Sequence, residues 1–259
     1  MWMENGIIRL LDVSLSYDGQ RKDAYVLKKI NMNIEPQEFV CVLGPSGCGK
    51  TSLLNLIAGF VNPSEGKILF KGIPIEGIDR RRGVVFQEPN LYEWMNVRKN
   101  INFGLRMRKL PKDEIQKKTD EVLHEVGLED SSEKYVYELS GGMKQRVGIA
   151  RVLINDPEIL LMDEPFSSLD ALNREKMQGF VRQIWKESQK TILFITHDVD
   201  EALMLGTRVV ILGGVPGGIL LNERIEYYKK FEDDDSVSVK FSKEYGETRR
   251  KFLSYIGMD

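Results

Sequence analysis

A glycine-rich stretch at positions 44–51, GPSGCGKT, has the residue types and spacing of a phosphate-binding loop. It fits the pattern G-x-x-x-x-G-K-[ST] and lies between an apolar run and a helical pattern. Glycines let the backbone approach phosphate oxygens and turn its N–H groups toward them. Lys50 supplies charge to the β- and γ-phosphates, and the Thr51 hydroxyl suits Mg²⁺. We expect the loop to hold a nucleotide through Gly44, Pro45, Ser46, Gly47, Cys48, Gly49, Lys50, Thr51 and Ser52.

A second set of candidate residues ends the apolar run ILLMDE at positions 159–164. The run predicts a buried strand whose C-terminal end carries Asp163 and Glu164, where open α/β sheets place their ligands. Because successive residues of a strand point to opposite sides, the two carboxylates can take different roles. We expect Asp163 to bind the metal, directly or through water, and Glu164 to act as general base on the attacking water.

Two further polar residues end apolar runs of the same predicted sheet. Gln87 ends GVVFQ, where its uncharged amide could orient water and reach Mg²⁺. His197 follows TILFIT and could reach a γ-phosphate, although a lone histidine at a strand end is more often structural. His124 lies in the middle of a predicted helix, and we interpret it as structural.

The stretch LSGGMKQRV, residues 139–147, resembles a second phosphate site. Ser140, Gly141 and Gly142 lead directly into a helical pattern, and the N–H groups of a helix N-terminus bind anions. One domain with one nucleotide site has no evident need of a second set of phosphate-facing groups.

Alternating strand and helix patterns must position these residues. Partly alternating runs at 7–17 and 27–34 predict strands, and the continuous apolar runs at 38–44, 158–165, 191–198 and 208–214 predict buried ones. A helix is expected at 51–59, and the pattern is mainly helical from about residue 96 to about 155. This alternation predicts an α/β fold with a mostly parallel sheet that is covered on both faces.

The composition restricts the class of protein. The 259 residues are 42% hydrophobic and 29% charged, which suits a chain with a substantial core. The net charge of −2 argues against a nucleic-acid binder. Cys41 and Cys48 flank the loop, and a disulfide between them would distort it, so we expect both to be reduced. The sequence has no signal-peptide pattern and no apolar run long enough to span a bilayer.

In chain order, the motifs resemble those of the ATP-binding subunit of an ABC transporter. The motifs are GPSGCGKT, Gln87, LSGGMKQ, ILLMDE, the triplet SLD at 168–170, and His197. The resemblance runs from about residue 7 to about residue 222. VVFQEPNLYEWMNVRKNINFGL, ITHDVDEALML and PGGI further resemble the importer ATPases for nitrate, sulfonates and taurine.

The resemblance implies the P-loop NTPase fold of the ABC ATPases. The expected domain has a core at 1–87 and 158–228, with an antiparallel β part on its N-terminal side. An inserted α-helical subdomain is expected at about 88–157, and a C-terminal extension at about 229–259.

The resemblance also assigns roles to single residues. Tyr17 matches the aromatic residue that stacks on adenine, with Tyr25 as a competing candidate. His197 matches the histidine that contacts the γ-phosphate, and Glu164 matches the catalytic base, so hydrolysis of ATP is expected. Four residues match groups that contact the ATP of an opposite subunit: Ser140, Gly141, Gly142 and Asp170.

The implied partners are a second copy of the chain and a membrane permease. Residues 88–94 lie where family members receive a helix of the permease, so docking is expected near Gln87 to Met95, with Tyr92, Trp94 and Met95 suited to an apolar groove. Glu93 stands where many relatives have proline, which puts the docking surface in doubt. A periplasmic or lipid-anchored solute-binding protein would act indirectly, and the expected place is the cytoplasmic face of the membrane. Two alternatives are an ABC ATPase acting on nucleic acid or ribosomes and a non-hydrolysing regulator.

Overall fold

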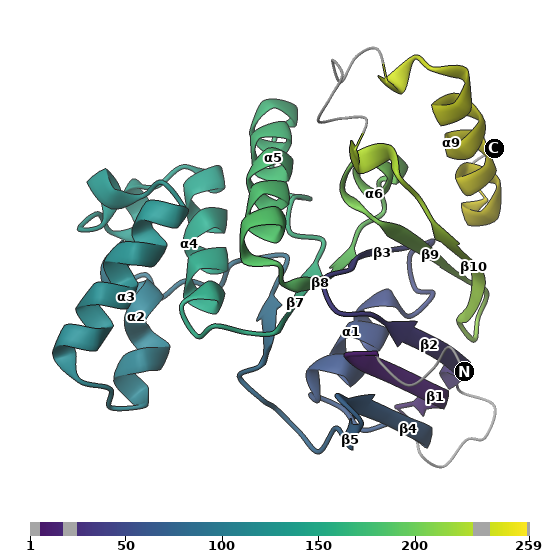
Figure 1. Ribbon diagram of the computed structural model, residues 1–259, viewed down its shortest axis with the longest axis horizontal. Coiled ribbons are helices and arrows are strands. Elements are labelled where there is room, and N and C mark those ends of the chain that lie inside the picture. Colours follow the sequence, from purple (N-terminus) through teal and green to yellow (C-terminus); the bar gives the residue numbers. More distant parts are fainter. Residues whose placement is uncertain (1–5, 18–24, 230–238, 258–259) are drawn as a thin grey trace. The chain divides into compact units, whose positions relative to one another are not determined.

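The computed structural model describes residues 6–17, 25–229 and 239–257 (Figure 1). Contacts divide the chain into two compact units, one of Met1–Asp79 with Ser188–Asp259 and one of Arg80–Glu187. Within the described ranges, no helix combines the length and the apolar character needed to cross a bilayer.

The first unit contains an antiparallel sheet with the strand order β2-β1-β4-β5. Its strands are β1 (Ile8–Ser16), β2 (Tyr25–Ile34), β4 (Glu65–Phe70) and β5 (Ile73–Pro74). Ile8 faces Ile34 on one side and Phe70 on the other, and all three side chains are buried. This sheet is the antiparallel part that the family resemblance predicted.

The same unit contains strands in the order β10-β9-β3-β8, of which β9, β3 and β8 are parallel. They are β3 (Phe39–Leu43), β8 (Thr191–Ile195) and β9 (Arg208–Gly213), with β10 (Gly218–Arg224) antiparallel to β9. Every residue of β3, β8 and β9 is buried, as expected for strands covered on both faces.

The described helices of the first unit include α1 (Lys50–Ala58), α6 (Val199–Leu205) and α9 (Lys243–Ile256). α1 follows β3 directly and ends at Gly59, whose φ of 84° lies in the left-handed region that favours glycine. α9 packs against α6 and β9 (Figure 1) and buries Tyr245 and Phe252. α9 therefore contributes to the core of this unit.

The second unit pairs two parallel strands with a group of helices. The strands are β6 (Arg82–Val85) and β7 (Ile159–Asp163). The helices are α2 (Val97–Met107), α3 (Lys112–Glu125), α4 (Gly141–Leu153) and α5 (Ala171–Ser188), with short 3-10 turns at Glu129–Ser131 and Val136–Glu138. α2 packs against α3 and α4, and α3 also contacts α4. The helical character predicted for residues 96–155 is confirmed.

Candidate functional site

The phosphate loop, residues 44–52, connects β3 to the first turn of α1. The N-cap of α1 is Gly49, with a φ of 98°, and no side chain caps the helix. Gly47 also has a positive φ, 80°, and a Cβ placed there would meet no atom within 4 Å. The loop is therefore open at Gly47 and presents the uncapped N-terminus of a helix, an arrangement that suits an anion.

The side chain of Lys50 is buried within this loop. Its Nζ donates hydrogen bonds to the carbonyl oxygens of Gly44, at 2.7 Å, and Pro45, at 3.0 Å. Only 8% of the residue is exposed. Because a buried ammonium needs compensation, these carbonyl contacts hold the charge at the loop, where an anionic phosphate would complete its environment.

Packing beneath the loop explains two of its glycines. A Cβ at Gly44 would lie 2.3 Å from the carbonyl oxygen of Leu212 in β9, and one at Gly49 would lie 2.6 Å from Leu27 Cδ2 in β2. Cys41 and Cys48 are both buried and form no disulfide with each other. Burial raises the pKa of both thiols above its usual value.

The two candidate adenine-stacking tyrosines differ in their surroundings. The Tyr17 side chain is 60% exposed, and its hydroxyl lies 3.1 Å from Ser52 Oγ in the first turn of α1. The Tyr25 hydroxyl donates a 2.7 Å hydrogen bond to Glu65, and Lys28 Nζ lies 5.7 Å from its ring centroid. Tyr17 is therefore the tyrosine that the structure places against the phosphate-loop helix.

His197 is an exposed residue in the turn between β8 and α6, and buried hydrogen bonds fix this turn. Thr196 Oγ1 donates to Glu201 Oε2 at 2.6 Å and accepts from the N–H of Asp198 at 3.0 Å. Asp198 Oδ1 caps α6 by accepting from the N–H groups of Asp200 and Glu201. Sequence reasoning missed Thr196 and Glu201, although Asp198 ahead of a helical pattern is a capping signal.

α9 contacts the helix that follows this histidine. Tyr245 Oη donates a 2.7 Å hydrogen bond to Asp200 Oδ1, and Arg249 Nε donates to both Asp200 carboxylate oxygens at 3.0 and 3.1 Å. Burial, reinforced by the Asp200 carboxylate, raises the pKa of the Tyr245 phenol well above its usual value. Sequence reasoning assigned no role to this segment, because the contact joins residues 45 and 49 positions apart.

In the second unit, Asp163 and Glu164 are half-buried at the end of β7, whose preceding residues are fully buried. Glu164 has a φ of 42°, a left-handed conformation that is uncommon for any residue except glycine. Ser167 holds this turn, because its N–H and its hydroxyl donate to the Glu164 carbonyl oxygen at 3.2 and 3.0 Å. The candidate base thus lies at a strained backbone position, a feature that clusters at functional sites.

Gln87 follows β6 and is exposed, and α4 supports the docking segment, residues 87–95, that begins with it. Arg151 of α4 donates hydrogen bonds to the carbonyl oxygens of Pro89, at 2.5 Å, and Asn90, at 2.9 Å. Its guanidinium also lies 5.6 Å from the ring centroid of Tyr92. Sequence reasoning missed Arg151, which is 61 positions from Asn90.

The aromatic residues of the docking segment divide into two kinds. The Tyr92 ring packs against Phe103, with centroids 4.7 Å apart, and also contacts Trp94 at 5.4 Å. Trp94 is 73% exposed, whereas Tyr92 and Met95 are half-buried. Tyr92 therefore contributes to internal packing, and Trp94 is the large apolar side chain that this segment presents at the surface.

The N-terminus of α4 carries the stretch that resembles a second phosphate site. Ser140 is the N-cap, and its Oγ accepts from the N–H of Met143 at 3.4 Å. Ser140 and Gly141 are exposed, and Gly142 is buried. Asp170 is also exposed, and hydrogen bonds from Asn173, at 3.0 Å from the backbone N–H and 2.6 Å from the side chain, lower the pKa of its carboxyl group.

The structure therefore assembles two groups of predicted residues. The first unit brings Tyr17 to the phosphate loop and also carries His197. The second unit carries Gln87, the carboxylates at the end of β7, the N-terminus of α4, and Asp170. Each group contains residues that suit phosphate chemistry, and only the first contains a buried lysine held in a glycine-rich loop.

Comparisons with known proteins give a consistent result. Residues 27–167 match the family described as ABC transporter. The chain is 48% identical over 230 residues to the taurine import ATP-binding protein TauB of Roseobacter denitrificans, covering 89% of this chain and 86% of that protein. Among solved structures, cbiO1 from Clostridium perfringens, described as part of the ABC transporter complex cbiONQ, has a TM-score of 0.80 at 31% identity, covering 93% of this chain and 97% of that one. The cassette MJ0796, described as a dimer in a post-hydrolysis state bound to ADP and Pi, has a TM-score of 0.73 at 32% identity, covering 85% and 99%.

Proposed function

The chain belongs to the ABC transporter family, and from this membership we propose that it is the ATPase subunit of an importer for taurine or a related sulfonate. The ATPase part of the proposal rests on one observation, the open loop of residues 44–52 with Lys50 held at the uncapped N-terminus of α1. The cargo part is supported by relatives at 41–48% identity that are named taurine import ATP-binding proteins.

ATP would bind at the phosphate loop. The N–H groups at the start of α1 and the Lys50 ammonium suit the phosphates, and the exposed ring of Tyr17 suits the adenine. Three side chains offer the hard oxygen ligands that Mg²⁺ prefers: Thr51, Gln87 and Asp163. When bound, the ion would neutralise charge on the β- and γ-phosphates.

Glu164 would accept the proton of the attacking water through its carboxylate. Its left-handed backbone, held by Ser167, fixes the direction in which the side chain leaves the end of β7. His197 would donate a hydrogen bond to the γ-phosphate, and the Lys50 ammonium would stabilise the charge that develops there. The buried bonds of Thr196 and Glu201 would keep the histidine in place during this step.

A second copy of the chain would complete the site. Ser140 and Gly141 are exposed at the N-terminus of α4, and together with Gly142 they would contact the γ-phosphate held by the partner. The exposed Asp170 would contact the opposite subunit. The similarity to MJ0796, described as a dimer bound to ADP and Pi, supports this arrangement.

The permease would dock on residues 87–95. Exposed Trp94 would insert into the partner, and Arg151 would transmit movement of the segment to α4 because it holds the backbone of Pro89 and Asn90. We take residues 88–157 as the helical subdomain that moves in this step. Glu93, in place of the proline of many relatives, would give this surface its own specificity. A solute-binding protein would act through the permease, and the chain would lie on the cytoplasmic face of the membrane.

Reconstitution tests the proposal. The chain would be assembled with the permease subunits and solute-binding protein encoded beside it, in vesicles supplied with MgATP. We expect ATPase activity to rise with the complete complex, and uptake of radiolabelled taurine to require ATP and Glu164. Stimulation by DNA or ribosomes in place of the permease would contradict the transport assignment. ATP-driven uptake of another solute with no taurine uptake would contradict only the cargo.

A further inference from the structure

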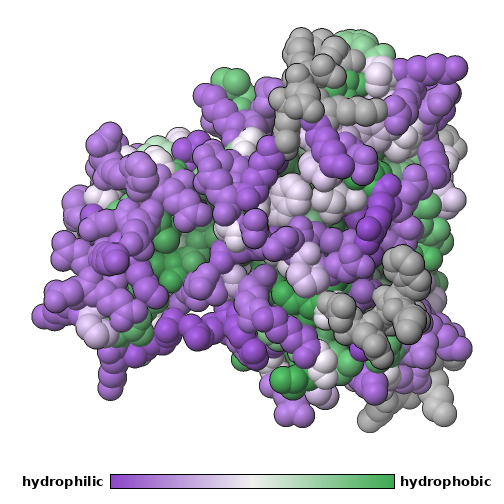
Figure 2. Space-filling model, viewed as in Figure 1, coloured by the Kyte–Doolittle hydropathy of each residue, from purple (hydrophilic) through white to green (hydrophobic). Residues whose placement is uncertain are grey.

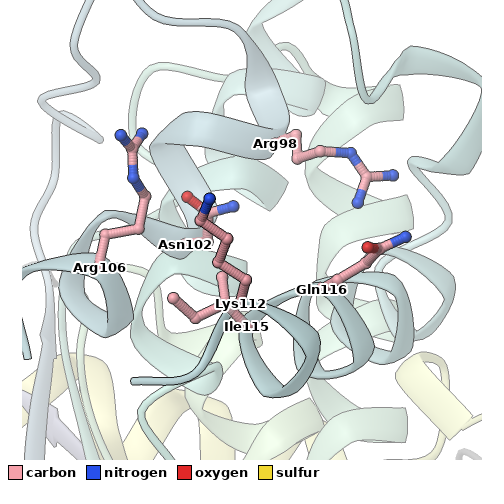
Figure 3. Close-up of a pocket in the computed structure, with 6 residues that line it drawn as sticks. All are labelled: Arg98, Asn102, Arg106, Lys112, Ile115 and Gln116. Carbon is pink, nitrogen blue, oxygen red and sulfur yellow. The ribbon is translucent and has the colours of Figure 1, made fainter. Parts of the chain in front are cut away.

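Two groups of charged side chains lie outside the proposed nucleotide site, and they differ in what they connect. In the second unit, a pocket of about 330 Å³ between α2 and α3 is lined in part by Arg98, Arg106 and Lys112 (Figure 3). Arg98 is paired with Asp120 of α3 at 2.6 Å, so this group holds α2 to α3. Figure 2 shows mainly hydrophilic side chains over these two helices. In the first unit, by contrast, an ion pair joins the C-terminal helix α9 to the helix that follows His197.

α9 is fixed to the first unit at points away from α6. The helix packs against β9 and buries Phe252 (Figure 1). Tyr227, which follows β10, donates a 3.1 Å hydrogen bond to the carbonyl oxygen of Glu244 in the first turn of α9. Lys251 forms an ion pair with Glu223 of β10. α9 is therefore a fixed support for the residues that it contacts.

Asp200 of α6 receives a separate set of contacts from α9. Tyr245 Oη donates to Asp200 Oδ1 at 2.7 Å, and Arg249 Nε donates to both carboxylate oxygens at 3.0 and 3.1 Å. Tyr245 and Arg249 are four residues apart, so both donors lie on one face of the helix. Tyr245 is only 1% exposed, and its packing fixes the direction of the hydroxyl. Hydrogen bonds from two side chains thus confine the Asp200 carboxylate.

The backbone of Asp200 is bonded to the turn that contains His197. The N–H of Asp200 donates to Asp198 Oδ1 at 2.8 Å, and the N–H of Asp198 donates to Thr196 Oγ1 at 3.0 Å. Thr196 and Asp198 are the two neighbours of His197 in the chain, so these bonds hold both sides of the histidine. α6 has only seven residues, and a helix this short depends on packing, here against β3 and α9.

We propose that α9 is a positioning element for this histidine. Tyr245 and Arg249 hold Asp200, and the first turn of α6 then keeps the preceding turn in the conformation that presents His197 to the γ-phosphate. The C-terminal helix would act on hydrolysis without touching the nucleotide. This inference rests on the role of His197 in the proposed function. Release of Asp200 should slow hydrolysis and leave ATP binding unchanged, because Lys50 and the N-terminus of α1 supply that binding.

Arg249→Gln tests the inference with a matched control on the same helix. The substitution removes the ion pair with Asp200, in which the two side chains are 45% and 33% exposed. Lys251→Gln is the control, because it removes the same charge from an ion pair of α9 with Glu223 of β10, where the exposures are 46% and 34%. Ion pairs this exposed contribute little to stability, so both variants should fold.

The imidazole signals of the chain show whether His197 responds. The sequence has two histidines, so the NMR spectrum of the histidine-labelled chain contains two sets of imidazole signals. His124 lies in the second unit, 2.5 Å from Glu129, and serves as the internal reference. In the nucleotide-free chain, Arg249→Gln should shift or broaden the His197 signal and leave the His124 signal unchanged. Lys251→Gln should change neither signal. This readout needs no hydrolysis, so it does not depend on the proposed function.

Kinetics then connect the position of the histidine to the reaction. In the reconstituted complex, Arg249→Gln should lower kcat about tenfold with an unchanged KM for ATP, since a misplacement of 1 Å can cost up to about a hundredfold. Tyr245→Phe, which removes only the hydroxyl, should lower kcat in the same way. In a His197→Ala background, Arg249→Gln should lower kcat no further, because residues that act through one group are not additive.

Three results would overturn the inference. The first is a His197 signal in Arg249→Gln that matches the Lys251→Gln control, and the second is an equal kcat for these two variants. The third is that the losses from Arg249→Gln and His197→Ala multiply in the double variant, since α9 would then act through another group. If the His197 signal responds but His197→Ala hydrolyses ATP at the wild-type rate, α9 positions the histidine and the proposed role of His197 in hydrolysis is wrong.

Discussion

The proposed function uses the N-termini of α1 and α4 as two versions of the same anion-binding element. Neither helix has an acidic residue in its first turn, a feature shared with α2 and α5, whereas α3, α6 and α9 each have at least one. Both therefore keep the positive end of the helix dipole available. They differ in the cap: α1 begins at Gly49 without a side-chain cap, and α4 begins at Ser140, whose hydroxyl accepts from the N–H of Met143.

The difference supports the proposal that the α1 element is complete within one chain and that the α4 element is half of a site. The loop at α1 encloses Lys50 and holds its ammonium with two carbonyl oxygens, so charge and N–H groups converge within one unit. The N-terminus of α4 has no such lysine, and Ser140 and Gly141 are exposed. An exposed, partly capped N-terminus suits an anion that another molecule brings. In the proposed dimer, this would explain why one chain carries two helix ends that suit phosphate.

The largest expected effect comes from a substitution that changes the hydrolysis step and leaves the N-termini of α1 and α4 unchanged. Glu164→Gln removes the proposed base and leaves α1 and α4 unchanged. Turnover should fall by at least about a thousandfold, within the range for loss of a general base and a charged group, while ATP binding is retained. Phosphate release measures the first effect, and size-exclusion chromatography with ATP should show a trapped dimer. Normal phosphate release by this variant would refute the assignment of Glu164.

A substitution at the α4 N-terminus tests whether it acts on a partner. Ser140→Arg places a bulky cation at an exposed cap, where it blocks close approach of a second chain. Hydrolysis should fall by about a hundredfold or more, as for loss of one preorganised donor. The affinity of the monomer for a fluorescent ATP analogue should be unchanged. A parallel loss of ATP affinity would mean that α4 belongs to the site of its own chain.

The α1 end should respond in the opposite way. Lys50→Gln removes the buried ammonium, so the affinity for ATP itself should fall. The expected loss is about tenfold to a hundredfold, which corresponds to the free energy of a charge-assisted hydrogen bond. Equilibrium dialysis of labelled ATP measures this on the isolated chain. Lys144→Gln, one turn into α4, is the control that removes a charge from the other helix. Equal losses in the two variants would erase the distinction between the two ends.

Sequence reasoning located both ends because each depends on a local pattern. The glycine spacing of residues 44–51 and the sequence LSGG can each be recognised from a few neighbouring residues, because the backbone conformation that they require is local. The contacts that sequence reasoning missed join distant residues, as in Arg151 with Pro89 and Tyr245 with Asp200. Whether a buried asparagine is paired likewise depends on what packs around it. Asn100 is fully paired, whereas the Oδ1 of Asn102, on the same helix, has no hydrogen-bond partner among the described residues. No single-residue pattern separates the two asparagines.

The smallest expected effect tests the caps themselves. Ser140→Ala removes the acceptor for the N–H of Met143, and this loss should destabilise the chain by up to about 1 kcal/mol. Ser140→Gly gives α4 the cap residue of α1 and should cost only a few tenths of a kcal/mol. Urea unfolding monitored by circular dichroism measures both values.

If hydrolysis depends on the Ser140 hydroxyl touching the partner's phosphate, both variants should lose similar activity despite their different stabilities. If the rate of hydrolysis instead followed the stability of the variants, Ser140→Gly would hydrolyse ATP at close to the wild-type rate. The Ser140 hydroxyl would then act only as a helix cap. The pair therefore separates the two roles of one side chain, because α1 shows that a helix of this chain can begin at glycine without a side-chain cap.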